Sequence, residues 1–277
     1  MDFSVCMSVY RNDYPNHFRT AVYSIYRQTV QPTEIILVVD GPVGTLLRDE
    51  IKLIEGEIPI IKVVWLAENV GLGNALRIAI NKASYDIIAR MDSDDIATET
   101  RFEKQLKFFE NNDRCISIVG GSIAEFVGNP DNIVGYRICP QTDEDIKQYM
   151  KSRCGFNHMT VMFRKSDVIR AGNYQDWHYN EDYFLWIRML LAGAVFYNIQ
   201  EVIVNVRVGL NMYSRRGGWA YFKSEYLLQK YMWDNDVISG VRFIINVLIR
   251  FIVQVAMPNK VRAFVFQKIL RKSISNI

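Results

Sequence analysis

Three carboxylates occupy four consecutive positions, Asp92, Ser93, Asp94 and Asp95, directly after an apolar run over residues 85–91. Like charges this close repel one another, so the cluster needs a positive charge from a basic side chain, a helix N-terminus or a bound cation. Oxygen ligands that alternate along an extended segment suit Mg²⁺ or Mn²⁺, which bind through one or two carboxylates together with substrate phosphates. The cluster therefore predicts a metal-bridged diphosphate site.

The same cluster also has a structural interpretation. In it, Asp94 or Asp95 caps a helix that begins near Glu99, and the other carboxylates are solvated. Arg90 and Arg101 are nearby basic side chains that suit either interpretation. Taken alone, the cluster does not decide between a helix cap and a metal site.

Polar residues also follow three other predicted strands. Ser8 and Tyr10 end the first, Asp40 follows the second, and residues 69–74 (Asn-Val-Gly-Leu-Gly-Asn) follow the third. Ligands of parallel sheets bind beyond the carboxyl ends of the strands, so these residues favour the metal interpretation. Residues 69–74 do not start a dinucleotide fingerprint, because Leu76 replaces its third glycine and the segment follows the third strand.

Two further carboxylates, Glu181 and Asp182, precede an apolar helical stretch. Acidic side chains in the first turn of a helix are favoured by its dipole, so the pair has a structural interpretation. Group transfer to a hydroxyl requires a base, and a carboxylate fixed at a rigid helix start can supply it. We favour the catalytic interpretation, given the acidic cluster upstream. His158 and Arg207 are weaker candidates, for contacts with an acceptor.

The first hundred residues alternate between strand and helix patterns. Apolar, β-branched runs predict strands, at residues 3–10, 35–39, 60–65 and 85–91. Apolar side chains at helical spacing predict helices, over residues 18–26 and 72–83, with another near 46–55. Such alternation is typical of parallel strands joined by right-handed crossovers, and it predicts an α/β fold.

The pattern is less regular from residue 114 to 207 and predicts an α+β extension. Strand candidates lie at 116–119, 160–163 and 194–197, and a helix at about 181–192. Neither a repeat nor a low-complexity linker marks a boundary before residue 217.

Composition limits the class of protein. The 277 residues are 49% hydrophobic, enough for one core with an appendage. The four cysteines are widely spaced and form no CxxC pair, which disfavours a zinc site or a disulfide framework. No charged segment leads into a long apolar run at the N-terminus, so we expect no secretory signal and a location inside the cell.

Positive charge is concentrated at residues 237–277, which hold seven Lys or Arg and no Asp or Glu. Residues 237–257 are long and apolar enough to span a bilayer, but each Arg near its centre costs roughly 2.5–3.5 kcal/mol. Arg242, Asn246 and Arg250 recur at helical spacing and form one polar stripe. We expect a helix that lies in the interface of an anionic membrane; the alternative is packing on the protein or on a second copy.

Together these segments resemble inverting GT-A glycosyltransferases of glycosyltransferase family 2, especially bacterial enzymes of O-antigen and amylovoran-type exopolysaccharide synthesis. The motifs lie, in order, at residues 8–10, 28–29, 38–41, 69–72, 89–95 and 180–183. The resemblance implies a Rossmann-like mixed sheet flanked by helices, with a C-terminal amphipathic helical extension. The implied organisation is a catalytic domain over residues 1–216 and a basic membrane-associated tail over 217–277. Within the former, residues 1–113 would bind nucleotide and 114–216 the acceptor.

Carried over to this chain, the resemblance implies a nucleotide-sugar site at Ser8, Tyr10, Asp40, Asn69, Gly71, Arg90, Asp92 and Ser93. Asp94, with Asp92, would hold Mn²⁺ or Mg²⁺ on the diphosphate. Asp182, with Glu181 beside it, is the implied base that deprotonates an acceptor hydroxyl. The implied mechanism is a single displacement at the anomeric carbon with inversion of configuration.

The implied substrates are a nucleotide-sugar, most simply a UDP-sugar, and a lipid-diphosphate-linked saccharide at the cytoplasmic face of the bacterial inner membrane. No nucleic acid partner is expected. Processive members of the family carry a Gln-X-X-Arg-Trp motif and transmembrane helices, which are not found here, so addition of a single sugar is expected. One alternative, a sugar-phosphate nucleotidyltransferase, is disfavoured because residues 8–13 contain no glycine. The other is a non-catalytic nucleotide-binding scaffold at the membrane.

Overall fold

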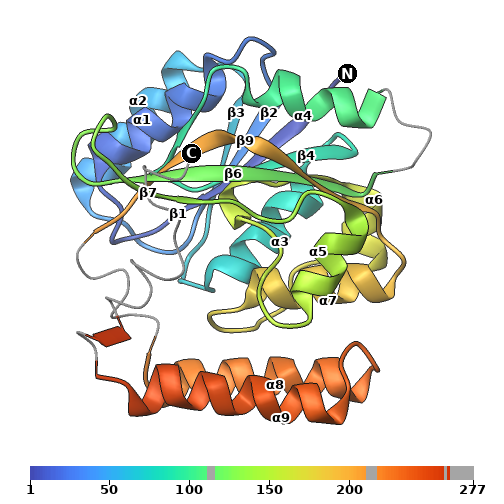
Figure 1. Cartoon of the computed structure of the whole chain (residues 1–277). Coiled ribbons are helices and arrows are strands. Elements are labelled where there is room, and N and C mark those ends of the chain that lie inside the picture. Colours follow the sequence, from blue (N-terminus) through green and yellow to red (C-terminus); the bar gives the residue numbers. More distant parts are fainter. Residues whose placement is uncertain (111–115, 210–216, 259–260, 263–277) are drawn as a thin grey trace.

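The computed structural model describes residues 1–110, 116–209, 217–258 and 261–262. Four parallel strands form one half of a mixed sheet, with β1 between β2 and β4 and with β3 beyond β2 (Figure 1). These strands are β1 (Ser4–Val9), β2 (Glu34–Val39), β3 (Ile61–Trp65) and β4 (Ile87–Met91). All four were predicted from their apolar runs.

The other half of the sheet continues from β4 through mostly antiparallel pairs. Its strands are β8 (Met162–Arg164), β6 (Ile118–Phe126), β9 (Phe196–Arg207), β5 (Ile96–Ala97) and, paired with β6 alone, β7 (Ile133–Arg137). Both β6 and β9 extend well beyond the predicted segments. The close approach of these strands depends on Gly120, where a Cβ atom would lie 2.3 Å from Asn198 Oδ1 and 2.7 Å from the Phe156 ring.

Helices cover both faces of this sheet. One face packs against α1 (Pro15–Tyr26), α2 (Thr45–Glu57) and α4 (Arg101–Glu110). The other packs against α3 (Leu72–Lys82), α5 (Asp143–Met150), α6 (Lys165–Arg170) and α7 (Glu181–Leu191). Alternate side chains of β2 enter the two cores, as expected of a strand buried on both sides. The predicted α/β class, with helices flanking a mixed sheet, is confirmed.

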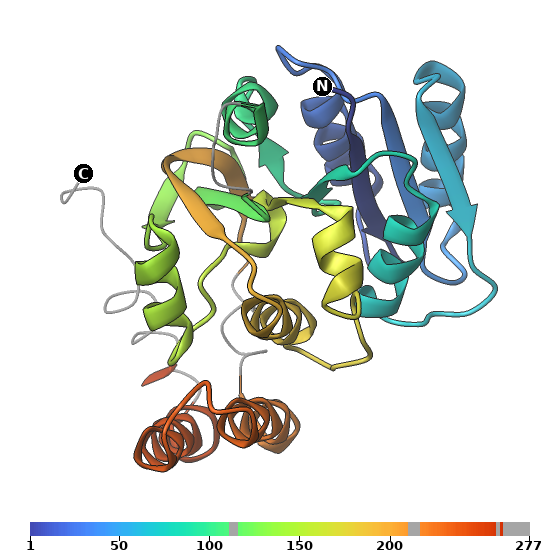
Figure 2. The same ribbon diagram turned by 90° about the vertical axis from the view of Figure 1, so that its right-hand side faces the viewer.

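The C-terminal extension contains two antiparallel helices where one was predicted. Helix α8 (Trp219–Asp234) lies beside α9 (Gly240–Phe251), which continues into the π-helical turn η3 (Ile252–Ala256). Both views show this hairpin as a layer below α5 and α7, on the side away from the N-terminus (Figures 1 and 2). Ser239 caps α9 by accepting a hydrogen bond from the Arg242 amide.

Two members of the predicted polar stripe of α9, Asn246 and Arg250, face the protein, whereas Arg242 is exposed. Asn246 is buried, and Arg250 forms a 2.6 Å ion pair with Glu225 of α8. The prediction that Arg250 adds to a free cationic face is therefore wrong, because Glu225 neutralises it. Lys260, Lys268, Arg271 and Lys272 of the predicted basic tail lie outside the described residues. Among the described helices, none has the length and apolar character needed to cross a bilayer.

Candidate active site

The carboxyl ends of β1, β2 and β4 meet where the strand order turns back, the position at which α/β sheets bind ligands. Tyr10 and Asp40 directly follow β1 and β2, and Asp92 directly follows β4. The eight residues of the predicted nucleotide-sugar site lie on β1 and β4 or in the loops that follow β1, β2, β3 and β4. The sheet thus gathers them at one edge, although their contacts with a ligand stay a prediction.

Asp40 organises the loop that follows β3. Its buried carboxylate accepts hydrogen bonds from the backbone amides of Val70 (2.7 Å) and Gly71 (3.1 Å) and from Asn69 Nδ2 (2.9 Å). Gly71 has φ 83°, a conformation that glycine adopts without strain, and it immediately precedes α3. Asp40 therefore shapes this loop directly.

Arg90 lies under the acidic cluster as its nearest cation. Its side chain is 2% exposed, and its Nη2 atom forms a 2.6 Å ion pair with Asp92. Its Nε and Nη1 atoms are buried and have no hydrogen-bond partner among the described residues. A buried polar group without a partner is costly, so two donor atoms of Arg90 are unsatisfied within the described part of the chain.

The helix-cap interpretation of the acidic cluster is excluded, because β5 separates the cluster from α4, which begins only at Arg101. Asp95 instead accepts a 2.9 Å hydrogen bond from the Arg207 amide, and the Asp94 carbonyl accepts one from Arg207 Nε at 3.2 Å. Burial, followed by the charges of Asp92 and Asp94, raises the pKa of Asp95 well above its usual value.

The donor set of this cluster fits a divalent cation that a substrate also ligates. Burial and the charges of Asp92 and Asp13 raise the pKa of Asp94 to about 6, as expected for a carboxylate beside other carboxylates without a cation. Among the described residues, no three His, Cys, Asp or Glu side chains are placed to hold a metal ion by themselves. An ion here would need phosphate oxygens to complete its coordination, as is usual for Mg²⁺ and Mn²⁺ sites of this kind.

Asp13 is a site residue that the sequence analysis missed. Its Oδ2 atom accepts hydrogen bonds from the Tyr10 amide and from Ser93 Oγ, both at 2.9 Å. It therefore joins the loop after β1 to the acidic cluster. Burial raises the pKa of Asp13. Its position three residues after Tyr10 was the only available signal, because Ser93 is remote in the sequence.

Glu181 and Asp182 form the first turn of α7, and neither side chain caps the helix. Burial and the Asp182 charge raise the pKa of Glu181 to about 7, and burial also raises the pKa of Asp182. Asp182 accepts hydrogen bonds from the Tyr183 amide (2.7 Å) and from the Cys154 thiol (3.7 Å). The positive charge of Arg90 opposes the rise in the pKa of both carboxylates.

A cavity of about 240 Å³ lies between α7 and the glycine loop, residues 69–73, that follows β3. Its lining includes residues 70–73, residues 176–179 and Glu181. Gly73 permits this approach, since a Cβ atom there would lie 3.0 Å from the Gln175 carbonyl oxygen and 3.2 Å from Glu181 Cβ. Two segments predicted separately from the sequence thus line one hollow.

The two predicted acceptor contacts lie in different places. His158 is half-buried beside Trp186, and its Nε2 atom lies 2.6 Å from the Tyr174 hydroxyl. Burial and then the charge of Arg90 lower the pKa of His158 well below its usual value, so its ring is neutral. Arg207 lies against the acidic cluster and above the Phe126 ring, with its guanidinium 4.7 Å from the ring centre. An acceptor role stays a prediction for both residues.

The fold and the paired acidic groups define a class, that of transferases acting on nucleotide-linked donors. Residues 4–169 match the family model described as Glycosyl transferase family 2, and the chain belongs to this family. It is a glycosyltransferase.

Two similar relatives are bacterial enzymes that match almost end to end. The chain is 35% identical to the amylovoran biosynthesis glycosyltransferase AmsE of Erwinia amylovora, over 96% of this chain and 98% of that protein. It is 36% identical to the UDP-Gal:alpha-D-GlcNAc-diphosphoundecaprenol beta-1,3-galactosyltransferase of Escherichia coli, over 98% of this chain and 97% of that protein. These similarities favour the transferase over the nucleotidyltransferase and scaffold alternatives.

Solved structures of low sequence identity share the fold. S. aureus TarS in complex with UDP-GlcNAc superposes with a TM-score of 0.66 at 15% identity, covering 91% of this chain and 73% of that chain. The mannosyltransferase PcManGT of Pyrobaculum calidifontis, in complex with GDP-Man and Mn²⁺, gives a TM-score of 0.62 at 14% identity, covering 94% and 73%. The fold is GT-A, as the resemblance implied.

Proposed function

We propose that this glycosyltransferase moves one sugar from a UDP-sugar to a hydroxyl of a lipid-diphosphate-linked saccharide, with inversion, during synthesis of a bacterial surface polysaccharide. One observation carries the proposal. The loop that Asp40 holds after β3 and Glu181, beside the proposed base, line one cavity of about 240 Å³. This arrangement supports a donor site and a base that serve one reacting centre.

The donor site follows from the sheet edge. Tyr10, exposed directly after β1, is proposed to contact the nucleobase with its ring, and Asp92 is proposed to contact the ribose. The Asn69–Gly71 loop, held by Asp40, brings backbone close to the nucleotide. Ser8 and Ser93 complete the site, and the free donor atoms of Arg90 suit the anionic diphosphate.

Asp94, assisted by Asp92, is proposed to hold Mn²⁺ or Mg²⁺. When bound, such an ion acts as a Lewis acid that stabilises the negative charge of the departing nucleoside diphosphate. The raised pKa of Asp94 supports this role, because a carboxylate crowded by other carboxylates gains most from a cation. PcManGT, which shares the fold, has been solved in complex with Mn²⁺.

Asp182 is proposed as the base. It takes the proton of an acceptor hydroxyl, whose oxygen forms a bond to the anomeric carbon from the side opposite the diphosphate. The bond from that carbon to the diphosphate oxygen breaks, and the leaving group takes the electron pair. The Tyr183 amide and the Cys154 thiol fix the carboxylate by hydrogen bonds. Glu181, next to it, lines the cavity beside the glycine loop.

The relatives support the choice of substrates. The E. coli relative is named for UDP-Gal and for GlcNAc-diphosphoundecaprenol, and AmsE is named for amylovoran biosynthesis. We propose an acceptor of the same chemical class, with His158 and Arg207 as candidate contacts. The enzyme would work as a peripheral protein on the cytoplasmic face of the inner membrane, held there by the basic residues within 217–277.

The test is nucleoside diphosphate release from a panel of UDP-, GDP- and dTDP-sugars, with Mn²⁺ and a saccharide on a lipid diphosphate. Release with one donor, lost in Asp94→Ala and Asp182→Asn, is expected. Asp167→Asn is the matched control, since Asp167 is also buried in a first helical turn, that of α6. Release of pyrophosphate instead, or full activity of both site variants, would refute the proposal.

A further inference from the structure

The outward side of α9 exposes a continuous row of aliphatic side chains. Six residues at helical spacing are each between 45% and 70% exposed: Val241, Ile244, Ile245, Leu248, Ile249 and Ile252. No described segment covers them. Helix α2, by comparison, exposes only two large aliphatic side chains, Leu46 and Leu53. A contiguous apolar face of this kind marks a binding surface rather than ordinary exposure.

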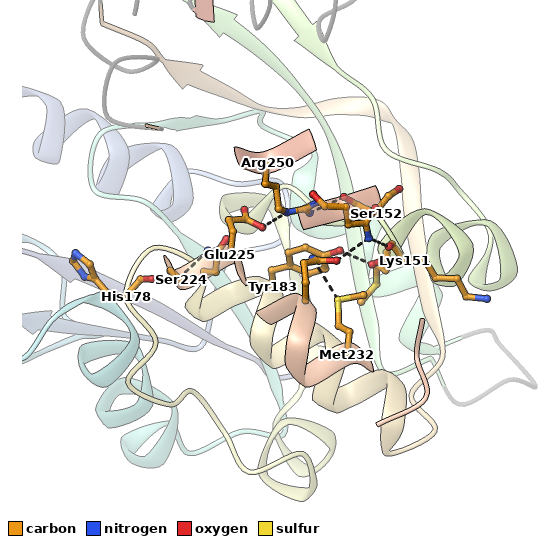
Figure 3. A network of polar contacts seen from close by, with 12 residues as sticks. Lys151, Ser152, His178, Tyr183, Ser224, Glu225, Met232 and Arg250 are labelled. Carbon is orange, nitrogen blue, oxygen red and sulfur yellow. Dashed lines mark hydrogen bonds and ion pairs between the residues drawn. The ribbon is translucent and has the colours of Figure 1, made fainter. Parts of the chain in front are cut away.

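Polar contacts on the inward side fix which face points outward. Arg250 donates to Glu225 and, at 2.8 Å, to the Ser152 carbonyl (Figure 3). Asn246 donates to Gln229 at 2.7 Å and to the Lys151 carbonyl at 2.8 Å. Rolling the helix to bury its apolar row would break these bonds and leave charged groups unpaired, which is strongly unfavourable.

Aromatic residues border the row at both ends of the hairpin. Trp233 stacks on Phe243 with ring centres 5.0 Å apart, and Trp219 lies 6.0 Å from the Phe251 ring. Both tryptophans are substantially exposed. Tryptophan favours the boundary between headgroups and acyl chains, so the ends of the row are suited to that boundary.

We infer that the apolar row of α9 inserts into the interface of an anionic lipid bilayer, with the hairpin lying parallel to the membrane. The excess of positive charge in this region favours an anionic lipid surface as the partner. Residues 217–277 contain nine Lys or Arg and three Asp or Glu, and two of those acids, Glu225 and Asp234, are paired within the hairpin. A helix with an apolar face among basic residues lies in such an interface. The inference rests on the proposed function only for the lipid-linked acceptor.

This placement adds insertion of the apolar row to the attraction by the basic residues, and the hairpin that carries the row contacts segments beside the proposed base. Ser224 of α8 donates to the His178 carbonyl and accepts from Asn180, the residue that precedes Glu181. Arg250 holds the Ser152 carbonyl, two residues before Cys154, which donates to Asp182. The membrane-facing hairpin is therefore hydrogen-bonded to both segments that support the proposed base.

Flotation of the full chain with phosphatidylglycerol–phosphatidylethanolamine vesicles tests the inference. Wild type should float and should stay bound in roughly 1 M salt, where the Debye length is only about 3 Å. Ile244→Asn with Leu248→Asn should lower the vesicle partition coefficient by about tenfold or more, because two aliphatic groups leave the lipid. Leu46→Asn with Leu53→Asn, on the exposed side of α2, is the matched control and should float like wild type.

Two results would overturn it. One is unchanged flotation of the α9 variant; the other is complete release of wild type by salt. A wild-type dimer that the α9 variant converts to monomers, with flotation unchanged, would assign the row to a second copy instead. Nucleoside diphosphate release with an acceptor on a short water-soluble chain separates the two proposals. The α9 variant should retain this release. Absence of the release in wild type, with flotation as expected, would refute only the proposed function.

Discussion

Two arginines, Arg90 and Arg250, show how differently the sheet edge and the helical hairpin use charge. Each guanidinium nitrogen of Arg250 donates a hydrogen bond, to Glu225, Asn246 and Ser152. Arg90 has an ion pair at one nitrogen and no described partner at the other two. A fully bonded arginine stabilises a fold, whereas one with free donors is prepared for a ligand. The hairpin arginine is thus fully bonded within the protein, whereas we propose that a ligand completes the bonding of Arg90 at the sheet edge.

The largest effect is expected at the proposed base. Asp182→Asn keeps the shape of the side chain but cannot accept the acceptor proton at neutral pH, so kcat should fall by about 10²–10⁴. Steady-state kinetics with the identified donor measure this. Glu181→Gln should retain much more activity, and equal losses in the two variants would contradict the assignment of Asp182.

Arg250→Met should lower stability most among the hairpin variants. It leaves Glu225 charged and partly buried without its partner, at a cost of about 3 kcal/mol in the free energy of unfolding. Urea denaturation measures the change. Lys230→Met, which breaks the exposed pair with Asp234, is the control and should cost less than about 1 kcal/mol.

Arg90→Lys should affect donor binding rather than stability, the reverse of Arg250→Met. A lysine can still pair with Asp92 but lacks the guanidinium fork, so the dissociation constant of the donor should rise about tenfold. Calorimetric titration with the nucleotide-sugar measures it. If Arg90→Lys instead resembled Arg250→Met, with lost stability and unchanged donor affinity, the contrast between the two arginines would fail.

The smallest effect is a pH dependence. Burial raises the pKa values of both Glu181 and Asp182, that of Glu181 to about 7, so the pair takes up a proton near neutral pH. Protonation of Glu181 removes a negative charge beside Asp182 and makes Asp182 a weaker base, so kcat should decrease as the pH falls through about 7 and level off above it. A pH–rate profile with saturating substrates checks this. A profile that is flat from pH 5 to 8, a range of about three units around this pKa, would contradict it.

The sequence predicted those helices and strands in which apolar residues recur at the spacing typical of the element. The strands β1 to β4 and the helices between them are examples, because apolar spacing alone distinguishes them. β6 and β9 were underestimated because glycine and polar residues interrupt them. Gly120 is required by contact with Asn198, and no local pattern shows that contact.

The candidate site was likewise predictable where its residues adjoin in the sequence, and not where remote residues meet. The acidic cluster was visible because its carboxylates adjoin, but the Asp13–Ser93 bond joins residues 80 positions apart. Arg207 could not be placed from the sequence, since the pairing of β5 with β9 brings it to Asp95. The helical spacing of Asn246 and Arg250 in α9 was visible in the sequence, yet their inward direction depends on contacts such as that with Glu225 of α8, an element that had not been predicted.

Donor binding by calorimetry, with Mn²⁺ present and with wild type, Asp94→Asn and Asp182→Asn compared, tests the central claim most directly. The account predicts that Asp94→Asn loses metal-dependent binding of the nucleotide-sugar, while Asp182→Asn binds it like wild type and fails only in transfer. Donor binding by Asp94→Asn equal to that of wild type, or its loss in Asp182→Asn, would contradict the division between a donor-binding group and a base.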